Sequence, residues 1–169
     1  MITNIAAYHF TPIDAPEAFA STLRARAEAL SLRGSVLVAG EGLNLFLAGD
    51  AGAIESFRAP LREDARFTGL RVKYSTSRQV PFARLKVKVK PEIISFRRDD
   101  ASPLGRRAPT VAPATLVQWL AQGHDDQGKR VVMLDTRNRQ EVAYGTFAGA
   151  LTFPIDKFTD LPAAVDAPP

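Results

Sequence analysis

The N-terminal part of the chain switches repeatedly between two hydrophobic periodicities. Apolar and polar residues alternate at period two, as in strands, over residues 4–10, 35–39, 43–48 and 70–74. Between these runs, apolar residues spaced three or four apart predict one helix after the first run and another after the third. The pattern therefore predicts the order strand, helix, strand, strand, helix, strand.

This order is typical of a ferredoxin-like (acylphosphatase-like) α+β fold. Asp14 and Asp50 are expected to cap the two helices, and Gly34 to end the first. Pro60 should kink the second helix or begin a new segment. An acylphosphatase-type hydrolase needs a glycine-rich anion loop with an arginine after the first strand. The segment 11–13, Thr-Pro-Ile, offers neither, which excludes that activity.

A further period-two run follows the predicted ferredoxin-like core, and it places four cations on one face of a strand. The cations are Arg84, Lys86, Lys88 and Lys90, and they alternate with Leu85, Val87 and Val89. Like charges on one face repel unless they are solvated or face an anion, and clustered phosphates would supply that anion. The alternative is an edge strand whose lysines prevent sheet-to-sheet pairing. The pattern leaves both interpretations open.

The charge distribution supports a polyanionic partner. The chain has a net charge of +4, but residues 71–107 hold 11 Lys and Arg against three Asp and Glu, whereas the remainder holds 11 against 15. A concentrated basic stretch indicates nucleic acid as a partner, or else a solvated face that aids solubility.

The absence of cysteine limits the chemistry of these 169 residues. It excludes disulfides, thiolate catalysis and Cys-ligated zinc or iron–sulfur sites. With two histidines, a His-rich metal site is not expected either, so we predict no metal and no cofactor. No apolar run approaches the length of a bilayer span and the start has no signal-like segment, so we expect a cytoplasmic protein with no membrane partner.

The C-terminal part contains a short apolar run that ends in an acid. Residues 131–134, Val-Val-Met-Leu, predict a strand buried on both faces and paired in parallel, with Asp135 at its carboxyl end, where open α/β sheets build their sites. Asp135 is expected to accept backbone N–H groups and to cap a short helix over 139–142. Gly145 and Gly149 lead into a second predicted strand over 150–153. The plainer interpretation is a strand–loop–strand unit with a capping aspartate and a salt bridge.

Three motifs in this chain resemble one family. Residues 134–138, Leu-Asp-Thr-Arg-Asn, with Glu141 and the segment 145–150, Gly-Thr-Phe-Ala-Gly-Ala, resemble the opening of a rhodanese-like domain. Upstream, Glu41-Gly42-x-Asn44 and the segment 81–88, Pro-Phe-Ala-Arg-Leu-Lys-Val-Lys, match as well. Together they are similar to the bacterial tRNA uridine hydroxylases, long catalogued as rhodanese-related sulfurtransferases. Gly40 and Leu45-Phe46 depart from the family pattern.

The resemblance implies a domain organisation and a function. It implies a ferredoxin-like domain over 1–95, a linker over 96–108 and the first part of a rhodanese-like domain over 109–169. The family enzyme hydroxylates the wobble uridine of tRNA at carbon 5 with molecular oxygen as co-substrate. A rhodanese-type sulfurtransferase and a non-catalytic RNA-binding module are the alternatives.

The resemblance also locates the reacting group outside this chain. The family's catalytic cysteine lies in a loop after the next strand, and we expect that position to fall beyond Pro169, the last residue. No residue of the chain is therefore expected to be catalytic. Without cysteine, we expect this chain alone to be inactive.

Particular residues also receive roles from the resemblance. Expected RNA-binding residues are Arg84, Lys86, Lys88 and Lys90. Gly40 and Gly42 predict a hairpin turn between the strands over 35–39 and 43–48, and Glu41 and Asn44, on or beside this turn, are further candidates. Asp135, Arg137 and Glu141 are expected to support the floor of an active site rather than to react. Because a buried strand at 131–134 would lack neighbours in a partial domain, we expect self-association through the open sheet edge.

Overall fold

The computed structural model describes residues 1–98, 101–105 and 108–166 of the chain. These residues form two compact units. The first comprises Met1–Ser95 and Ser102–Gly105, and the second comprises the remaining described residues. The predicted linker, 96–108, includes residues 99–100 and 106–107, which lie outside the described residues. The partial rhodanese-like domain was predicted to run to Pro169, and its last three residues, 167–169, also lie outside them.

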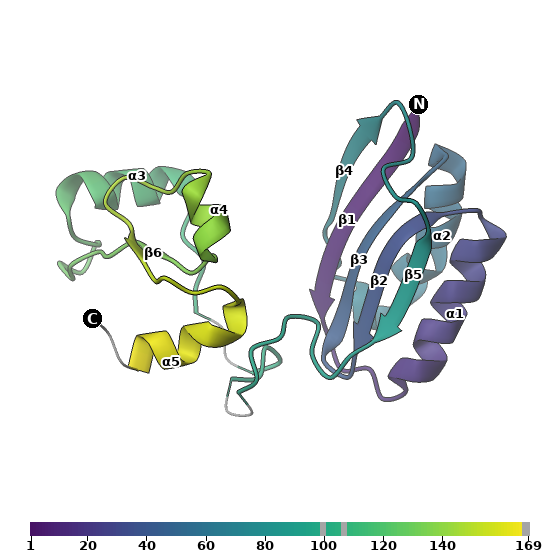
Figure 1. Cartoon of the computed structure of the whole chain (residues 1–169), viewed down its shortest axis with the longest axis horizontal. Coiled ribbons are helices and arrows are strands. Elements are labelled where there is room, and N and C mark those ends of the chain that lie inside the picture. The colour runs from purple at the N-terminus through teal and green to yellow at the C-terminus, as the bar shows by residue number, and fades with distance from the viewer. Residues whose placement is uncertain (99–100, 106–107, 167–169) are drawn as a thin grey trace. The chain divides into compact units, whose positions relative to one another are not determined.

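The first unit has the predicted order of elements followed by one more strand. These elements are β1 (Ile2–Phe10), α1 (Pro16–Ala29), β2 (Arg33–Ala39), β3 (Gly42–Gly49), α2 (Ala51–Glu63), the 3-10 turn η1 (Ala65–Phe67), β4 (Val72–Ser77) and β5 (Leu85–Val89). The sheet order is β4-β1-β3-β2-β5 (Figure 1). Its first four strands are antiparallel neighbours, as the ferredoxin-like prediction requires, whereas β5 pairs in parallel with β2.

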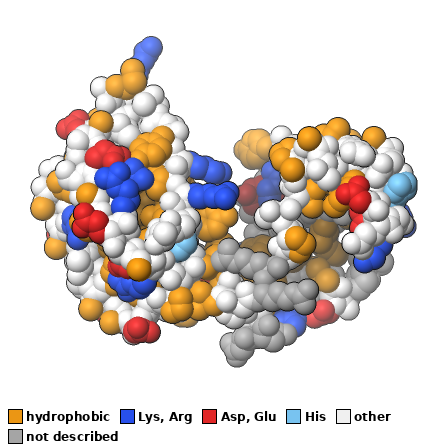
Figure 2. Space-filling view, turned by 180° about the vertical axis from the view of Figure 1, so that it is seen from behind, with side chains coloured by type: hydrophobic (Ala, Val, Ile, Leu, Met, Phe, Trp, Pro, Cys, Tyr) orange, Lys and Arg blue, Asp and Glu red, His pale blue; other side chains and the backbone are white. Residues whose placement is uncertain are grey.

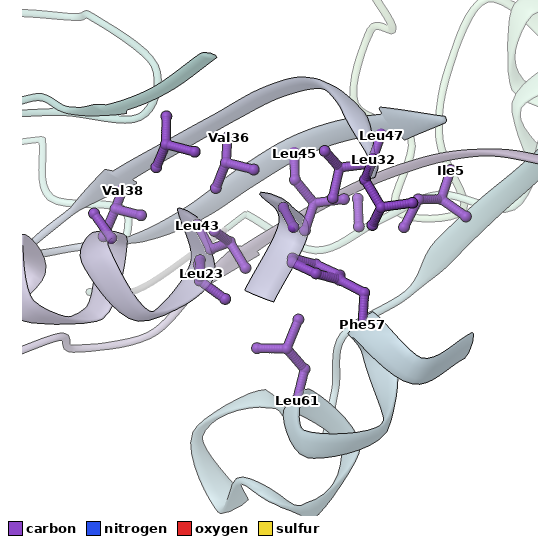
Figure 3. Packing of buried hydrophobic residues seen from close by; sticks show 14 of the residues in the cluster. Ile5, Leu23, Leu32, Val36, Val38, Leu43, Leu45, Leu47, Phe57 and Leu61 are labelled. Carbon is purple, nitrogen blue, oxygen red and sulfur yellow. The ribbon is translucent and has the colours of Figure 1, made fainter. Parts of the chain in front are cut away.

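One face of this sheet carries the hydrophobic core. The strands contribute residues at every second position, such as Ile5, Val36 and Leu45, and the helices contribute Leu23 and Phe57 (Figure 3). These five side chains are at most 3% exposed. Since α1 and α2 both pack on this face, the opposite face of the sheet is left without a helix. That side, which carries no helix of this unit, is called the open face below.

Two local predictions for the ends of α1 are wrong, and Pro60 does not begin a new segment. The helix α1 is preceded by Ala15 without a side-chain cap, so Asp14 does not cap it. It ends at Ala29, before Ser31 adopts a positive φ of 53°, and Gly34 lies inside β2 instead. Gly34 is required there because a Cβ would approach the Phe46 carbonyl oxygen to 2.0 Å. Pro60 lies in the last turn of α2, where the helix continues to Glu63 despite the missing N–H group.

The second unit contains short elements: α3 (Pro113–Gln122), β6 (Leu134–Asp135), α4 (Arg139–Ala143), β7 (Leu151–Thr152), the 3-10 turn η2 (Phe158–Asp160) and α5 (Leu161–Asp166). The strands β6 and β7 pair in parallel, as expected. The predicted buried strand is wrong, because Val132 lies outside β6 and is 55% exposed, while Leu134 is 42% exposed. Among the described residues β6 has β7 as its single neighbour, so its faces are not enclosed.

None of the described helices combines the length and the apolar character that crossing a bilayer requires.

Candidate functional site

The basic run of the first unit lies on and beside β5. Lys86 and Lys88 are exposed on the open face, while Val87 between them is 6% exposed and joins the core. Arg84 and Lys90 flank the strand and are also exposed. Their backbones extend the ladder, because the Gly34 N–H donates to the Arg84 carbonyl and the Lys90 N–H donates to the Val38 carbonyl. The predicted alternation of charged and apolar positions is therefore confirmed.

The position of β5 bears on the two interpretations of its lysines. It is an edge strand, where lysines also discourage pairing with another sheet. Even-numbered residues of β5 bond to β2, so the odd-numbered backbone groups face outward. Arg24 of α1 already donates to the outward carbonyl of Val87 at 2.6 Å. Because a side chain from α1 covers part of the edge, the lysines are not its sole protection.

The candidate residues Glu41 and Asn44 differ in their position and in their contacts. Glu41 occupies the tight turn between β2 and β3, and its carboxylate accepts the backbone N–H of Ile93 at 2.8 Å. It thereby ties the hairpin to the segment that follows β5, a structural role that the sequence did not reveal. Asn44 lies on the open face of β3, opposite Tyr8 of β1 and Leu37 of β2. Only Asn44 shares a face with the lysines.

In the second unit, Asp135 is the centre of a closed hydrogen-bond network. Its carboxylate accepts two bonds from the Arg137 guanidinium, from Nε at 2.9 Å and from Nη2 at 2.6 Å. It also accepts the Arg137 backbone N–H and the Thr146 hydroxyl, the latter at 2.7 Å. Arg137 Nη2 donates further to the Gly145 carbonyl at 2.7 Å. The network joins the end of β6 to the loop that leads toward β7.

Both charges of this pair are fixed at neutral pH. The hydrogen bonds from the Arg137 side chain, followed by that from Thr146, hold the pKa of Asp135 well below its ordinary value. The hydrogen bond to Asp135 in turn raises the pKa of Arg137. A carboxylate that stays ionised and an arginine that stays charged do not exchange protons near pH 7. The pair can therefore orient the loop and set a local field, and it is unsuited to general acid–base catalysis.

The cap of α4 differs from the expected one. Asn138, and not Asp135, accepts the Glu141 backbone N–H at 3.0 Å, and the Glu141 carboxylate accepts the Asn138 N–H at 3.2 Å. This reciprocal pair is a capping box, so Glu141 has a structural role at the start of α4. Asp135 is unavailable as the cap because its oxygens are engaged by Arg137 and Thr146. Glu141 affects the network through its charge, which helps to raise the pKa of Arg137.

An open cavity of about 550 Å³ adjoins the Asp135 network. Its lining includes Asp135 and Arg137, together with Thr146, Tyr144 and Phe147. Tyr144 and Phe147 are 96% and 64% exposed, which leaves two aromatic side chains at the cavity without cover. No sequence pattern singled out Tyr144, whereas Thr146 and Phe147 were included only as members of the matched segment 145–150. Within the described part of the chain, no three His, Asp or Glu side chains are grouped as a metal site would need.

The family of the chain follows from a comparison with protein-family models. Residues 2–93 match the family described as "UPF0176 acylphosphatase like domain". The chain belongs to the UPF0176 family. The match covers the unit in which the ferredoxin-like sheet is observed, so the fold predicted for that unit is confirmed. The matched residues do not extend to 109–169, and the rhodanese-like character of that part remains a prediction.

Curated relatives of this UPF0176 chain carry one name. A "tRNA uridine(34) hydroxylase" of Xanthomonas campestris pv. campestris (strain 8004) is 68% identical over 165 residues, which are 98% of this chain and 65% of that protein. The protein of the same name from Xylella fastidiosa (strain 9a5c) is 58% identical over 165 residues, covering 98% of this chain and 64% of that protein. The predicted resemblance is thus confirmed. The chain spans about two thirds of these relatives.

Among solved structures, the acylphosphatase from Bacillus subtilis is similar to this UPF0176 chain with a TM-score of 0.41 and 17% identity. The similarity covers 52% of this chain and 99% of that one.

Proposed function

We propose that this chain is the RNA-engaging part of a tRNA uridine(34) hydroxylase. The observation that carries the proposal is the 68% identity with the Xanthomonas campestris protein of that name across nearly the whole chain. The complete enzyme would hydroxylate the wobble uridine at carbon 5, consume molecular oxygen as co-substrate and act in the cytoplasm, where tRNA is found. The chain itself would need no cofactor to bind tRNA.

In this proposal the first unit holds the tRNA. Lys86 and Lys88 lie on one exposed face, with Arg84 and Lys90 at the ends of the same strand. Cations at every second residue of a strand are about 6.6–6.8 Å apart, a spacing that successive backbone phosphates can match. Electrostatic attraction of this kind brings tRNA to the protein without reading its sequence, so identification of the wobble position requires further contacts.

The second unit would support the reacting centre. The pair of Asp135 and Arg137 holds the loop at the carboxyl end of β6 in one conformation and contributes fixed charges beside the cavity. A positive guanidinium near a thiolate lowers the pKa of the thiol, which is the help that a nucleophilic cysteine needs. The 169 residues contain no cysteine, so the nucleophile would have to come from residues outside them, in keeping with the expected position beyond Pro169.

The purified chain is expected to bind tRNA and to leave it unmodified. The test incubates the chain and the full-length Xanthomonas campestris relative with tRNA under oxygen and measures 5-hydroxyuridine by mass spectrometry of nucleosides. The relative should produce it, whereas the chain should not, because no thiolate is present. Hydroxylation by the chain alone would contradict the proposal that the reacting group lies outside these 169 residues. A relative that transfers sulfur from thiosulfate to cyanide and does not hydroxylate tRNA would contradict the proposed activity.

We also propose that the second unit associates with a second copy of the chain. Apolar side chains such as Val132, Leu134 and Leu151 are 42–58% exposed, and β6 and β7 each have an unpaired edge among the described residues. Light scattering should give a mass that rises with protein concentration, and amide exchange over 131–153 should slow in parallel. The double substitution Leu134→Lys and Leu151→Lys should abolish both effects. A strict monomer with strongly protected amides over 131–153 would contradict the association.

A further inference from the structure

The open face of the first unit has side chains arranged in rows across the sheet. In one row, strand register places Tyr8, Asn44, Leu37 and Lys88 next to one another on β1, β3, β2 and β5. In the next row it places Lys73, Ala6, Phe46, Ser35 and Lys86 on β4, β1, β3, β2 and β5. Each row thus carries one aromatic ring and ends in a lysine of β5.

The strands place charge of a single sign on this face. The five strands, every residue of which the structure describes, contain no Asp or Glu. Their four Lys and Arg residues are Arg33, Lys73, Lys86 and Lys88, and strand register places all four on the open face. The helices α1 and α2 on the other face hold four Glu and four Arg. Several of these form ion pairs, and red and blue side chains lie together on this unit in Figure 2.

The aromatic rings of the open face are unusually accessible. Tyr8 and Phe46 are 59% and 46% exposed, although both project from inner strands of the sheet. Phe46 has small cross-strand neighbours on this face, Ala6 and Ser35, which leave its ring accessible. Tyr8 lies opposite Asn44 and meets the ring of Phe10 edge-on. Large exposed apolar groups within a polar rim indicate a binding surface.

A cavity of about 330 Å³ lies at the second row. It is lined by Phe46, Ala6 and Asn4 from the sheet and by Pro81 and Phe82 from the segment between β4 and β5. Lys73 and Tyr74 of β4 also line it. The cavity therefore combines three aromatic side chains with a carboxamide and a cation, which are the groups that hold a base and its phosphate.

We propose that the open face binds an unpaired segment of RNA, with successive bases stacked on Tyr8 and Phe46 and the phosphates held by Lys86, Lys88 and Lys73. The proposal rests on the proposed function and specifies which part of the RNA this unit recognises. Because Tyr8 and Phe46 are diagonal neighbours on adjacent strands, their backbone positions are about 7–8 Å apart. That is roughly twice the 3.4 Å rise between stacked nucleotides, so the two bases are unstacked from each other.

The same geometry explains why paired RNA is a poor ligand for this surface. Bases inside a duplex stack on one another, and their faces are closed to protein rings. Asn44 lies beside Tyr8 and Leu37, where its carboxamide can bond to the edge of a base stacked on Tyr8. A loop such as the one that contains a wobble uridine presents bases in this accessible form.

The test compares two labelled RNAs by fluorescence anisotropy: single-stranded hexauridylate and a blunt hairpin duplex. Tyr8→Leu and Phe46→Leu keep an apolar side chain but remove the ring. Each is expected to weaken hexauridylate binding by about 5- to 150-fold and to change duplex binding by less than about twofold. The matched control is Phe19→Leu, because Phe19 projects from α1 on the helix-covered side of the sheet, where its half-buried ring stacks on Phe67. It should leave binding of both RNAs unchanged.

Thermal melting of each variant confirms that the unit remains folded. The stacking surface is refuted if Tyr8→Leu and Phe46→Leu bind hexauridylate as tightly as the parent chain does. The proposed function still stands in that case if neutralising the β5 lysines weakens the binding of both RNAs. If the parent binds neither RNA, the RNA-engaging role fails with it. Binding of the parent to vesicles of phosphatidylcholine with anionic phosphatidylglycerol, without RNA binding, would assign the face to a membrane surface and overturn the inference.

Discussion

Neutralising Arg84, Lys86, Lys88 and Lys90 together should reduce the salt dependence of tRNA binding by up to about three units of log–log slope. Each cation that touches one phosphate releases condensed counterions and contributes roughly 0.7–0.9 to that slope. The four cations lie along one exposed strand, so one RNA backbone can meet them at the same time. The measurement is the tRNA dissociation constant at several KCl concentrations between about 50 and 200 mM.

Two further double variants are compared with the full set, one on β5 and one as a control on the helices. Lys86→Gln with Lys88→Gln should lower the slope by about 1.5 units, half the effect of the full set. Arg26→Gln with Arg62→Gln removes the same charge from the helix-covered side and should leave the slope unchanged. An unaltered slope in the β5 variants, combined with new concentration-dependent association, would assign these lysines to protection of the sheet edge.

Phe57→Ala should destabilise the first unit by about 3–5 kcal/mol. Phe57 is fully buried and projects from α2 into the core that the sheet shares with both helices (Figure 3). Truncation removes its burial free energy and leaves a cavity, because the rigid neighbours close only part of it. The free energy of unfolding of a single domain is only about 5–15 kcal/mol, so this one substitution removes a large fraction of it.

Urea unfolding of the first unit, followed by circular dichroism, measures the loss. Phe46→Ala is the matched control, since it removes the same side chain from the open face, where 46% of it is exposed. Its cost should stay below about 1 kcal/mol. A similar cost at both positions would show that the open face is covered in solution and would also weaken the case for its accessibility.

The order of elements in the first unit was predictable because its residues obey local rules. Strand and helix periods of two and 3.6 residues are visible without tertiary information, and they gave β1 to β4 with both helices in the right order. The glycines around Glu41 predicted the hairpin between β2 and β3 correctly. The error at Gly34 arose because the end of a helix depends on the following turn, here Ser31 with its positive φ. The error at Asp14 is one residue at the other end, since α1 begins at Pro16 and Ala15 occupies the cap position.

The second unit was less predictable because burial is not a local property. The run Val-Val-Met-Leu at 131–134 is typical of an enclosed strand, but enclosure needs neighbours on both sides. Among the described residues β6 has one neighbour, and Val132 remains exposed. The choice of Asn138 over Asp135 as the cap of α4 also depended on distant partners. The hydroxyl of Thr146, eleven residues away, donates a hydrogen bond to one carboxylate oxygen of Asp135.

The sequence by itself determined the ferredoxin-like order of the first unit, the alternation of cations along 84–90 and the family resemblance. Each of these depends on residues close together in the chain. Only the tertiary structure decided that β5 lies at the sheet edge beside β2, and that Glu41 holds Ile93. It also decided that Tyr8, Phe46 and the β5 lysines share the open face. Strand register and helix placement set those relations, and they join residues about 40 to 80 positions apart that no local pattern connects.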